Sequence, residues 1–442
     1  MSGLTILAAV FVVYALVASK LDRWSITAPM VFATVGLLLG PSALNLLQFH
    51  IGDEAVLTAT ELTLALLLFA DASTVRLREV EDDARLPGRL LLLGLPLAIA
   101  IGTLVAGLMF PDIGWAAAAV IATILAPTDA ALGLAVFTNP AVPVRIRRAL
   151  NVESGLNDGL ATPFLTLFLA LLASEEGVGH GSWLVKATEQ IGFAIVAAIA
   201  VGVIGGTLLS AARARGWTSH ISEQLVILAL ALLAYGGSIE IGGNGFVSAF
   251  VAGILFGATT RGRMHQPVEF TETLALFLSF VVWTVFGALL VGPVLTGRIA
   301  VGPIAYAALS LTIIRMIPVT VSWAGLGLRP WTIAFAGWFG PRGLASVVFT
   351  LLTIQTLHHA GMTNDTVVEV ATWTIVLSVV LHGLTAAPLS RAYGGWISRR
   401  QGSVPELVEA PEPRVWRRSL RHHRNRPPGD PVDRPAKPSQ SS

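Results

Sequence analysis

The chain has 442 residues, of which 54% are hydrophobic and only 13% are charged, and it contains no cysteine. Soluble domains carry roughly 25% charged residues, so this composition excludes an ordinary soluble protein. The lack of cysteine excludes disulfides, zinc–thiolate sites and thiol nucleophiles. Apolar runs follow one another almost without pause, and they are long enough to cross a hydrocarbon core of roughly 30 Å as helices. The sequence therefore predicts an all-α polytopic membrane protein.

Thirteen apolar ranges follow in chain order, and we expect each to be a membrane-spanning helix. No basic segment precedes the first range and further ranges follow it, so we interpret it as a helix and not as a cleaved signal. Together they predict one transmembrane domain over residues 1–398. The ranges are 4–19, 26–40, 56–72, 89–110, 114–137, 149–173, 187–212, 222–239, 245–258, 272–292, 298–322, 331–355 and 367–391.

The basic residues between these ranges predict the orientation of the chain. Loops after odd-numbered ranges contain fourteen Lys and Arg, whereas loops after even-numbered ranges contain only Lys186 and Arg298. Loops rich in Lys and Arg stay in the cytoplasm. We therefore expect the amino terminus outside and the carboxyl terminus in the cytoplasm, in the inner membrane of a prokaryote.

The last part of the chain, residues 399–442, differs in composition from the rest. It has ten Lys and Arg against five Asp and Glu, a net +5, so the remainder of the chain carries −3 to give the overall +2. Its many Pro, Arg and Ser residues predict a disordered basic cytoplasmic tail. We expect a solvated tail, with contact between its arginines and anionic lipid as the alternative.

Eight charged residues lie within or at the edges of the apolar ranges. A charge at membrane depth costs at least ~3 kcal/mol, so it usually faces a partner or a watery cavity. A single acid can equally be a tether between helices, whereas several together indicate a polar pathway. The eight are Glu61, Asp71, Asp129, Glu153, Asp158, Glu240, Arg315 and Arg342.

Two of the apolar ranges are interrupted by proline beside a charge. Ala126-Pro127-Thr128-Asp129 lies in the fifth range and Gly340-Pro341-Arg342-Gly343 in the twelfth. Proline breaks a helix, and a break at membrane depth is tolerated only inside protein or beside a cavity. The two ranges that contain the breaks are seven ranges apart. Because seven is odd, these two ranges cross the membrane in opposite directions. This predicts an inverted repeat of helices 1–6 and 8–13 with two broken crossing helices, a pattern that marks a transporter's binding site. Asp129 is expected to offset positive helix ends and Arg342 negative ones.

A third motif, Glu153-Ser154-Gly155-Leu156-Asn157-Asp158-Gly159, lies early in the sixth range. Spacing of four residues places Glu153 over Asn157 and Ser154 over Asp158. This strip presents a carboxylate with hydroxyl and amide oxygens nearby, the ligands that hard cations prefer. Asp158 is too far from the basic loop to be a helix cap.

Depth predicts two further assignments. Glu153 and Arg315 have similar depth and opposite charge, and we expect them to form an ion pair. Asp71 lies near the cytoplasmic end of the third range, either as a residue of a cytoplasmic funnel or simply at the interface.

Taken together, these motifs resemble the NhaP-like sodium/proton antiporters of the monovalent cation:proton antiporter superfamily, over roughly residues 5 to 395. The resemblance rests on Thr128-Asp129, Glu153-Ser154 with Asn157-Asp158, Arg315 and the Gly340–Gly343 motif. It implies a thirteen-helix fold with a six-helix core and a dimerisation domain. It also implies a homodimer that works by an elevator-like shift of the core.

For the site, the resemblance implies that Asp158 binds either the cation or the proton. Ser154 and Thr128 resemble further Na⁺ ligands, Asn157 the partner that holds the broken-helix region, and Glu153 with Arg315 the structural ion pair. Asn157 and Arg315 also resemble the electroneutral branch, because electrogenic relatives carry a second aspartate and usually a lysine there.

The function expected is therefore electroneutral exchange of Na⁺ or Li⁺ for H⁺, with both ions competing for Asp158. No cofactor, catalytic residue or nucleic-acid partner is expected. A K⁺/H⁺ antiporter of the same fold is the nearest alternative. A cation channel is less favoured because the sequence has no carbonyl-rich filter run. An intramembrane enzyme is also less favoured, because His358, His359 and His382 lack ligand spacing.

Overall fold

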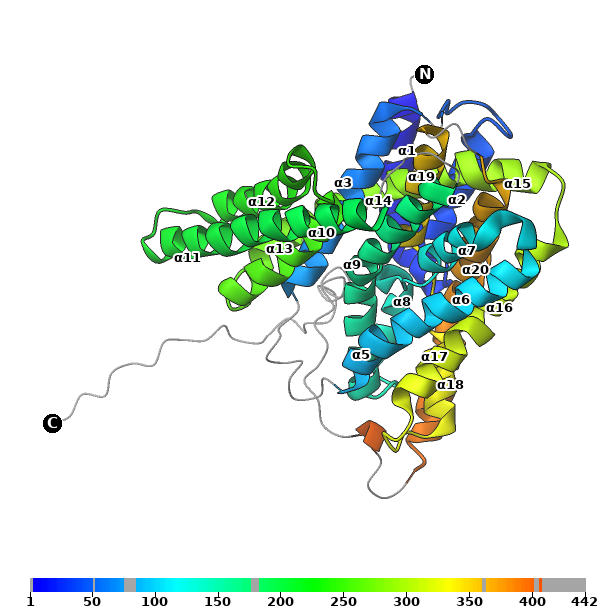
Figure 1. Ribbon diagram of the computed structural model, residues 1–442. Helices are drawn as coiled ribbons and strands as arrows, with labels where there is room; N and C mark the ends of the chain where they lie inside the picture. The colour runs from blue at the N-terminus through cyan, green and yellow to red at the C-terminus, as the bar shows by residue number, and fades with distance from the viewer. Residues whose placement is uncertain are drawn as a thin grey trace.

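The computed structural model describes residues 3–50, 52–74, 85–175, 183–359, 363–400 and 405–407 (Figure 1). Within these ranges all regular elements are helices, as the composition predicted. The helices are, in chain order, α1 Gly3–Arg23, α2 Ala28–Leu39, α3 Glu54–Thr74, α5 Arg85–Arg89, α6 Leu95–Met109, α7 Gly114–Ile124, α8 Ala130–Phe137, α9 Val144–Glu175, α10 Trp183–Ile199, α11 Gly206–Ala214, α12 His220–Glu240, α13 Gly245–Thr259, α14 His265–Phe286, α15 Gly292–Thr296, α16 Val301–Leu311, α17 Ile313–Trp323, α18 Pro330–Trp338, α19 Leu344–His359 and α20 Asp365–Ile397.

Short helical turns join several of these helices into longer ones. π-Helical turns connect α5 to α6, α10 to α11 and α14 to α15, over Leu90–Gly94, Ala200–Gly205 and Gly287–Val291. In the described part of the chain, nine helices are long and apolar enough to cross a membrane, and α2, α7, α13 and α19 belong to shorter apolar helices. The protein is thus a multi-pass membrane protein.

The predicted ranges agree with the helices in position but are mostly too short. Each range overlaps one continuous helix, except that 114–137 covers α7 and α8, 298–322 covers α16 and α17, and 331–355 covers α18 and α19. Arg145, Arg147 and Arg148, expected in a loop, lie in the first turns of α9. The guanidinium of Arg147 is buried there and donates to the carbonyls of Val142 at 2.9 Å and Phe137 at 3.3 Å, so this charge is satisfied inside the protein.

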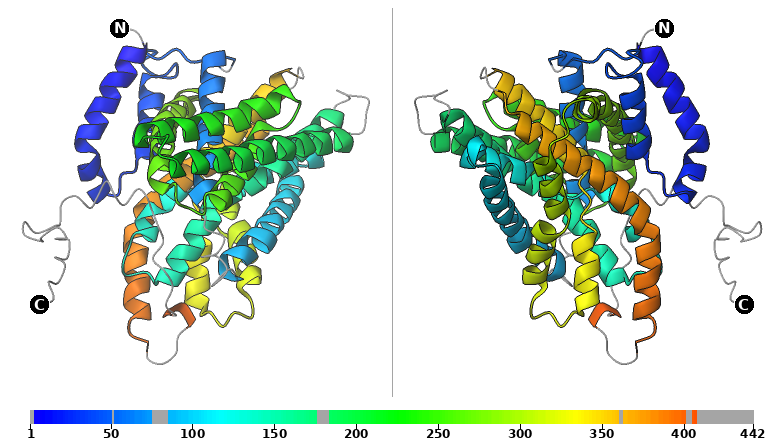
Figure 2. Two further views of the ribbon diagram at one scale, coloured as in Figure 1. Left: turned by 90° about the vertical axis from the view of Figure 1, so that its left-hand side faces the viewer. Right: turned by 90° about the vertical axis from the view of Figure 1, so that its right-hand side faces the viewer.

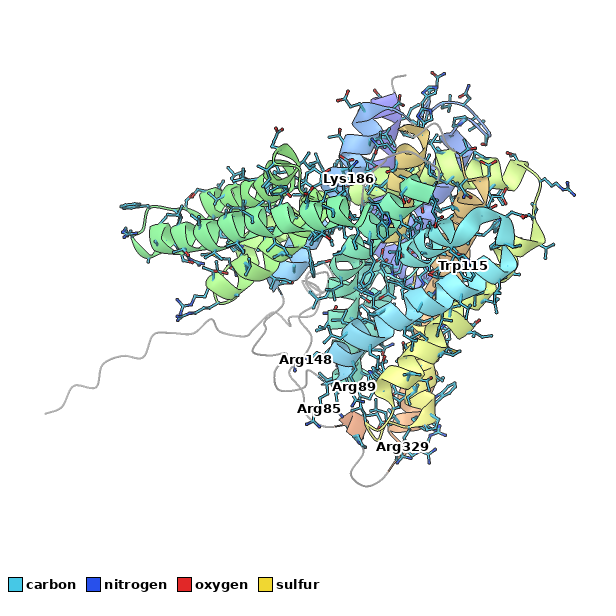
Figure 3. The ribbon with its side chains drawn as sticks, viewed as in Figure 1. Arg85, Arg89, Trp115, Arg148, Lys186 and Arg329 are labelled. Carbon is cyan, nitrogen blue, oxygen red and sulfur yellow. The ribbon has the colours of Figure 1, made fainter. Side chains whose placement is uncertain are left out.

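Four arginines lie together at one end of the molecule (Figure 3). They were all counted in loops after odd-numbered ranges, and they lie near the end where α5 begins and α17 meets α18 (Figure 3). The four are Arg85, Arg89, Arg148 and Arg329. Lys186, from an even-numbered loop, lies well away from them (Figure 3). The expected arginines at 76 and 78 lie outside the described residues. The orientation of the chain in the membrane stays a prediction.

The helices pack in two groups. In the first, α3 packs against α13 and α14, and α12 and α2 join them. In the second, α7 packs on α6 and α9, while α20 packs on α8 and α16. Figure 2 shows α1 standing at one edge of the molecule, where none of its most apolar segment is buried. We call these sets the α3 group and the α9 group.

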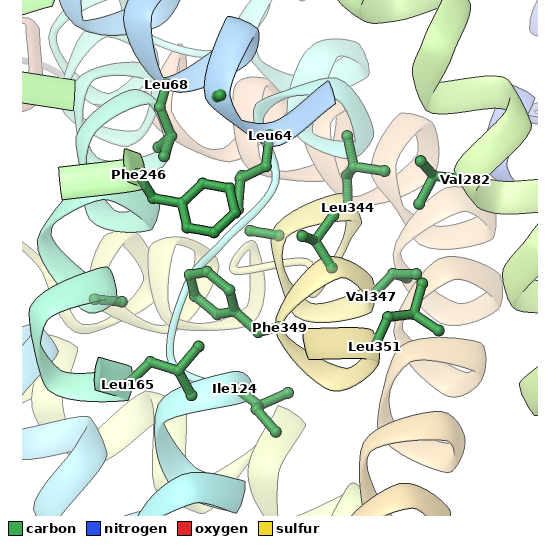
Figure 4. Packing of buried hydrophobic residues seen from close by; sticks show 14 of the residues in the cluster. Leu64, Leu68, Ile124, Leu165, Phe246, Val282, Leu344, Val347, Phe349 and Leu351 are labelled. Carbon is green, nitrogen blue, oxygen red and sulfur yellow. The ribbon is translucent and has the colours of Figure 1, made fainter. Parts of the chain in front are cut away.

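The seam between the two groups is filled by apolar side chains around α19. Figure 4 shows side chains of α19 close to residues of α3, α7, α9 and α13. Phe349 is fully buried there, and Leu64 and Ile124 are buried with it. The half-helix α19 therefore lies where the two groups meet.

The carboxyl-terminal end of the described chain departs from the expected disordered tail. Pro405–Leu407 forms a short 3-10 turn, and Glu406 is completely buried. Arg145 donates to the Pro405 carbonyl at 2.7 Å, and the Glu406 carboxylate accepts from the Arg329 amide and the Thr332 hydroxyl, both at 2.8 Å. These contacts hold the turn against the first residues of α9 and α18. The rest of the predicted tail, from residue 408, lies outside the described residues.

Candidate functional site

The two helix breaks touch each other. α7 ends at Ile124 and α8 begins at Ala130, while α18 ends at Trp338 and α19 begins at Leu344. The Asp129 amide donates to the Pro341 carbonyl at 2.7 Å, which ties the two extended segments together. A proline in each segment has no amide to donate, so each helix ends there and resumes after it. The crossing brings four helix ends to one place.

Asp129 caps two helices at this crossing. Its Oδ1 accepts from the amides of Ala131 at 2.5 Å and Leu132 at 3.1 Å, at the start of α8. Its Oδ2 accepts from the Leu344 amide at 2.8 Å, at the start of α19. One carboxylate therefore faces two positive helix ends. A Cβ on Gly343 would collide with this carboxylate, so the close approach of the two breaks requires glycine there.

Arg342 lies at the carboxyl end of the first broken helix, α7. Its guanidinium donates to the carbonyls of Ala126 at 2.6 Å and Pro127 at 3.2 Å, just beyond α7. The side chain is almost completely buried, and the Ser346 hydroxyl adds a bond to the Ile124 carbonyl at 2.7 Å. The carbonyls at the carboxyl end of α7 are thus satisfied by a cation and a hydroxyl.

A hydroxyl and amide cluster connects the first break to α9. Thr128 and Ser154 lie 2.9 Å apart through their hydroxyl oxygens, and the Asn157 amide donates to the Thr128 hydroxyl at 2.6 Å. All three side chains are buried. Asn157 therefore holds the extended segment at Thr128 against α9, where the hydroxyl oxygens of Thr128 and Ser154 lie next to each other.

Asp158 lies on the same face of α9 as Ser154, one turn further along. Its Oδ1 is a buried oxygen without a hydrogen-bond partner among the described residues, and so is Oδ1 of Asn157. Asp129 and Asp71 are near enough to act on the Asp158 carboxylate electrostatically. An unpartnered buried carboxylate oxygen is costly unless it carries a proton or meets a cation. This arrangement can accept either ion.

Glu153 and Arg315 form a buried, two-fold hydrogen-bonded ion pair between α9 and α17. The two bonds measure 2.5 and 2.9 Å, and the side chains are 4% and 6% exposed. A Cβ on Gly340 would collide with the Arg315 side chain, so the pair supports the second break directly. With Glu153 as its partner, Arg315 is not required to neutralise Asp158.

The other acids named from the sequence lie apart from this cluster. Asp71 is half-buried near the end of α3 and acts on the Asp158 carboxylate electrostatically. Glu61 accepts a 2.8 Å hydrogen bond from the Tyr235 hydroxyl, which joins α3 to α12. Glu240 is exposed at the end of α12. Glu61 thus fits the tether interpretation, and Glu240 carries no buried charge.

Two buried residues of α20 at the second break were not predicted as site residues. The Arg342 amide donates to the Ser378 hydroxyl at 2.6 Å, and the His382 ring lies 2.8 Å from the Trp338 carbonyl through Nε2 and 3.2 Å from the Ser378 hydroxyl through Nδ1. His382 thereby satisfies the last carbonyl of α18. Sequence reasoning considered His382 only as a metal or acid–base residue. The spacing of four between Ser378 and His382 was the available signal.

The sequence also matches a known family over most of its length. The family model described as "Sodium/hydrogen exchanger, transmembrane" matches residues 6–392. The chain belongs to the sodium/hydrogen exchanger family. This confirms the predicted resemblance to NhaP-like cation:proton antiporters and places the chain in a family of transporters.

Relatives within the sodium/hydrogen exchanger family differ in the ion they carry. A Na⁺/H⁺ antiporter of Schizosaccharomyces pombe is 26% identical over 389 residues, covering 79% of this chain and 81% of that protein. A K⁺/H⁺ antiporter, NhaP2, of Shewanella sp. (strain ANA-3) is 24% identical over 396 residues and 87% of this chain. The chain spans only 65% of the length of that Shewanella relative.

The fold is also that of a solved exchanger. The structure of the sodium proton antiporter MjNhaP1 from Methanocaldococcus jannaschii at pH 8 superposes with a TM-score of 0.70 at 20% identity. The superposition covers 89% of this chain and 99% of MjNhaP1. This sodium/hydrogen exchanger thus has the NhaP fold over nearly all of MjNhaP1.

Proposed function

We propose that this protein is a secondary transporter that exchanges Na⁺ or Li⁺ for H⁺ at the site formed by Asp158, Ser154 and Thr128. The observation that carries the proposal is the unpartnered, buried Oδ1 of Asp158 beside the cluster of Thr128, Ser154 and Asn157. The resident charges around it are already compensated. Asp129 is bonded to helix amides, and Glu153 is bonded to Arg315.

Competition at one carboxylate supplies the exchange mechanism. When Asp158 is ionised, its oxygens and the hydroxyls of Ser154 and Thr128 offer the ligands that a hard cation prefers. When Asp158 is protonated, the cation loses its anionic ligand and leaves. Asp158 must therefore gain and lose its proton near working pH. One monovalent cation exchanged for one proton moves no net charge, so the rate should not depend on membrane potential.

The identity of the cation is the second question. Relatives include both a Na⁺/H⁺ and a K⁺/H⁺ antiporter, so K⁺/H⁺ exchange at the same residues is the alternative proposal. Both cations take oxygen ligands, and their difference lies in size. We favour Na⁺ because the match covers 81% of the Na⁺/H⁺ relative and only 65% of the K⁺/H⁺ relative.

Alternating access is proposed to occur by movement of the α9 group against the α3 group in a homodimer. The division of the helices into two packing groups supports a relative shift. The exposed apolar side chains of α1, such as Leu16 and Val12, support a surface for lipid or a second copy.

We also propose thirteen crossings in an inverted repeat. The basic end faces the cytoplasm of a prokaryotic cell, and Asp71 lies in the cytoplasmic approach to the site.

The test is ion exchange in proteoliposomes that enclose a pH-sensitive dye. We expect Na⁺ and Li⁺ gradients to drive proton flux, K⁺ gradients to drive much less, and an imposed potential to leave the rate unchanged. Asp158→Asn removes the ionisable carboxylate of the proposed site and should abolish exchange. Its matched control is Asp112→Asn, which should keep exchange because Asp112 is an exposed aspartate. Exchange driven best by K⁺ would favour the alternative, and no exchange with any of the three cations would reject the proposal.

A further inference from the structure

Asn244 lies between the two groups of helices, at the start of α13. Its Oδ1 accepts from the amides of Phe246 and Val247, both at 3.0 Å, and so caps the helix. Because the carbonyl oxygen is used in this way, the orientation of the side-chain amide is fixed. The Nδ2 group is therefore left to donate in one direction, away from α13.

The acceptor of that donor is on α9. Asn244 Nδ2 donates to the Thr166 hydroxyl at 2.7 Å. Thr166 in turn donates to the Thr162 carbonyl at 3.0 Å, and the Thr162 hydroxyl donates to the Asp158 carbonyl at 3.0 Å. Donors and acceptors thus follow in one direction along α9 from Asn244 to the residue that carries the proposed ion site. Thr166 lies about two turns beyond Asp158, on the side away from the arginines that begin α9.

The seam below this hydrogen bond is tightly packed. A Cβ on Gly159 would collide with the ring of Phe250, so α9 and α13 approach closely at the residue next to Asp158. Ser248, one turn after Asn244 on the same face of α13, is completely buried. Phe246 and Leu165 contribute to the buried apolar cluster in the same region (Figure 4). A shift of α9 along α13 would have to break the Asn244–Thr166 bond and open this packing.

We propose that the hydrogen bond from Asn244 to Thr166 is a lock between the two groups of helices. It holds the seam closed on the side of Asp158 away from the basic end of α9, and it breaks once in each transport cycle. The inference rests on the proposed alternating access. It adds to that proposal two residues that bind no ion themselves. They control whether ions can reach Asp158 from the side away from the basic end of α9.

The structure allows each half of the lock to be removed with little other change. Asn244→Ser keeps an oxygen that can cap α13 and removes the Nδ2 donor without adding a charge. Thr166→Val keeps the shape of the side chain and removes the acceptor. Thr188→Val is the matched control, because among the described residues the Thr188 hydroxyl bonds within its own helix, to the Leu184 carbonyl at 2.7 Å.

The reporter is a single cysteine in a chain that has none. Ser248→Cys places a thiol of similar size at the buried seam. The purified protein in proteoliposomes is treated with a membrane-impermeant maleimide, and the labelling rate is measured for each variant in the Ser248→Cys background. Proton flux driven by a Na⁺ gradient is recorded on the same preparations.

If the lock exists, Asn244→Ser and Thr166→Val each raise the labelling rate about two- to tenfold, the range expected for loss of one buried hydrogen bond. Asn244→Ser combined with Thr166→Val gives no further increase, because both remove the same bond. Thr188→Val leaves the rate unchanged. Labelling of the lock variants equal to that of Thr188→Val, or additive effects in the double variant, would overturn the proposal. Labelling is read without ion flux, so loss of exchange in the parent protein would reject the proposed function and not the lock.

Discussion

The Glu153–Arg315 pair permits a quantitative test, because either partner can be removed while the other remains buried. The side chains are 4% and 6% exposed and share two hydrogen bonds. Glu153→Met leaves an uncompensated guanidinium, and Arg315→Met leaves an uncompensated carboxylate. Removal of one partner of a buried pair costs about 3–5 kcal/mol. The fraction of unfolded protein should therefore rise roughly a hundredfold or more in each single variant.

The double variant Glu153→Met with Arg315→Met should recover most of the lost stability. Well-packed apolar residues that replace a buried pair are often neutral or stabilising. The measurement is thermal unfolding of the purified protein in a single detergent, for the wild type, both single variants and the double variant. Asp53→Asn is the control, because the His50–Asp53 pair is 76% and 41% exposed and should contribute only about 0–1 kcal/mol.

Two results would contradict this reasoning. Single variants that unfold at the temperature of the wild type would mean that the pair does not compensate buried charge. A double variant as unstable as the sum of both singles would mean that the residues act independently of each other.

Three further predictions concern stability in the same unfolding assay. Asp129→Asn keeps an acceptor but removes the charge from two helix ends, so we expect a loss of about 1–2 kcal/mol; an unchanged unfolding temperature would argue against the double cap. Gly159→Ala should cost about 1–3 kcal/mol because its methyl group meets the Phe250 ring, and Phe250→Leu in the same chain should restore part of this, whereas no restoration would place the cost elsewhere. Glu406→Ala removes the acceptor of the Thr332 hydroxyl and should cost about 1–3 kcal/mol, with partial recovery in Glu406→Gln; a wild-type melting curve for Glu406→Ala would mean that the Glu406 contacts do not stabilise the fold.

Much of the fold could be predicted because membrane insertion constrains composition so strongly. Apolar length alone located the helices, and proline beside a charge located both breaks. Helix ends were less accessible. Arg145 and its neighbours were assigned to a loop because they are charged, yet α9 begins before them.

For the site, residue spacing gave candidates but not contacts. Depth and opposite charge indicated that Glu153 and Arg315 lie at one level, and their side chains meet in the structure. The contact of His382 with the end of α18 could not be predicted, because its acceptor is a backbone carbonyl, which every residue carries and which gives no signal in the sequence. The burial of Glu406 could not be predicted either, because its surroundings in the sequence are polar and rich in proline, which is typical of a disordered segment.

The most direct test of competition at Asp158 is the release of protons when a cation binds. Purified protein in weakly buffered detergent is mixed with Na⁺, with Li⁺ and, as a control for ionic strength, with choline. Wild-type protein should release up to one proton per site on addition of Na⁺ or Li⁺ and none with choline, and Asp158→Asn should release none with any of the three. Equal proton release from Asp158→Asn, or no release from wild-type protein that exchanges ions in proteoliposomes, would contradict the account.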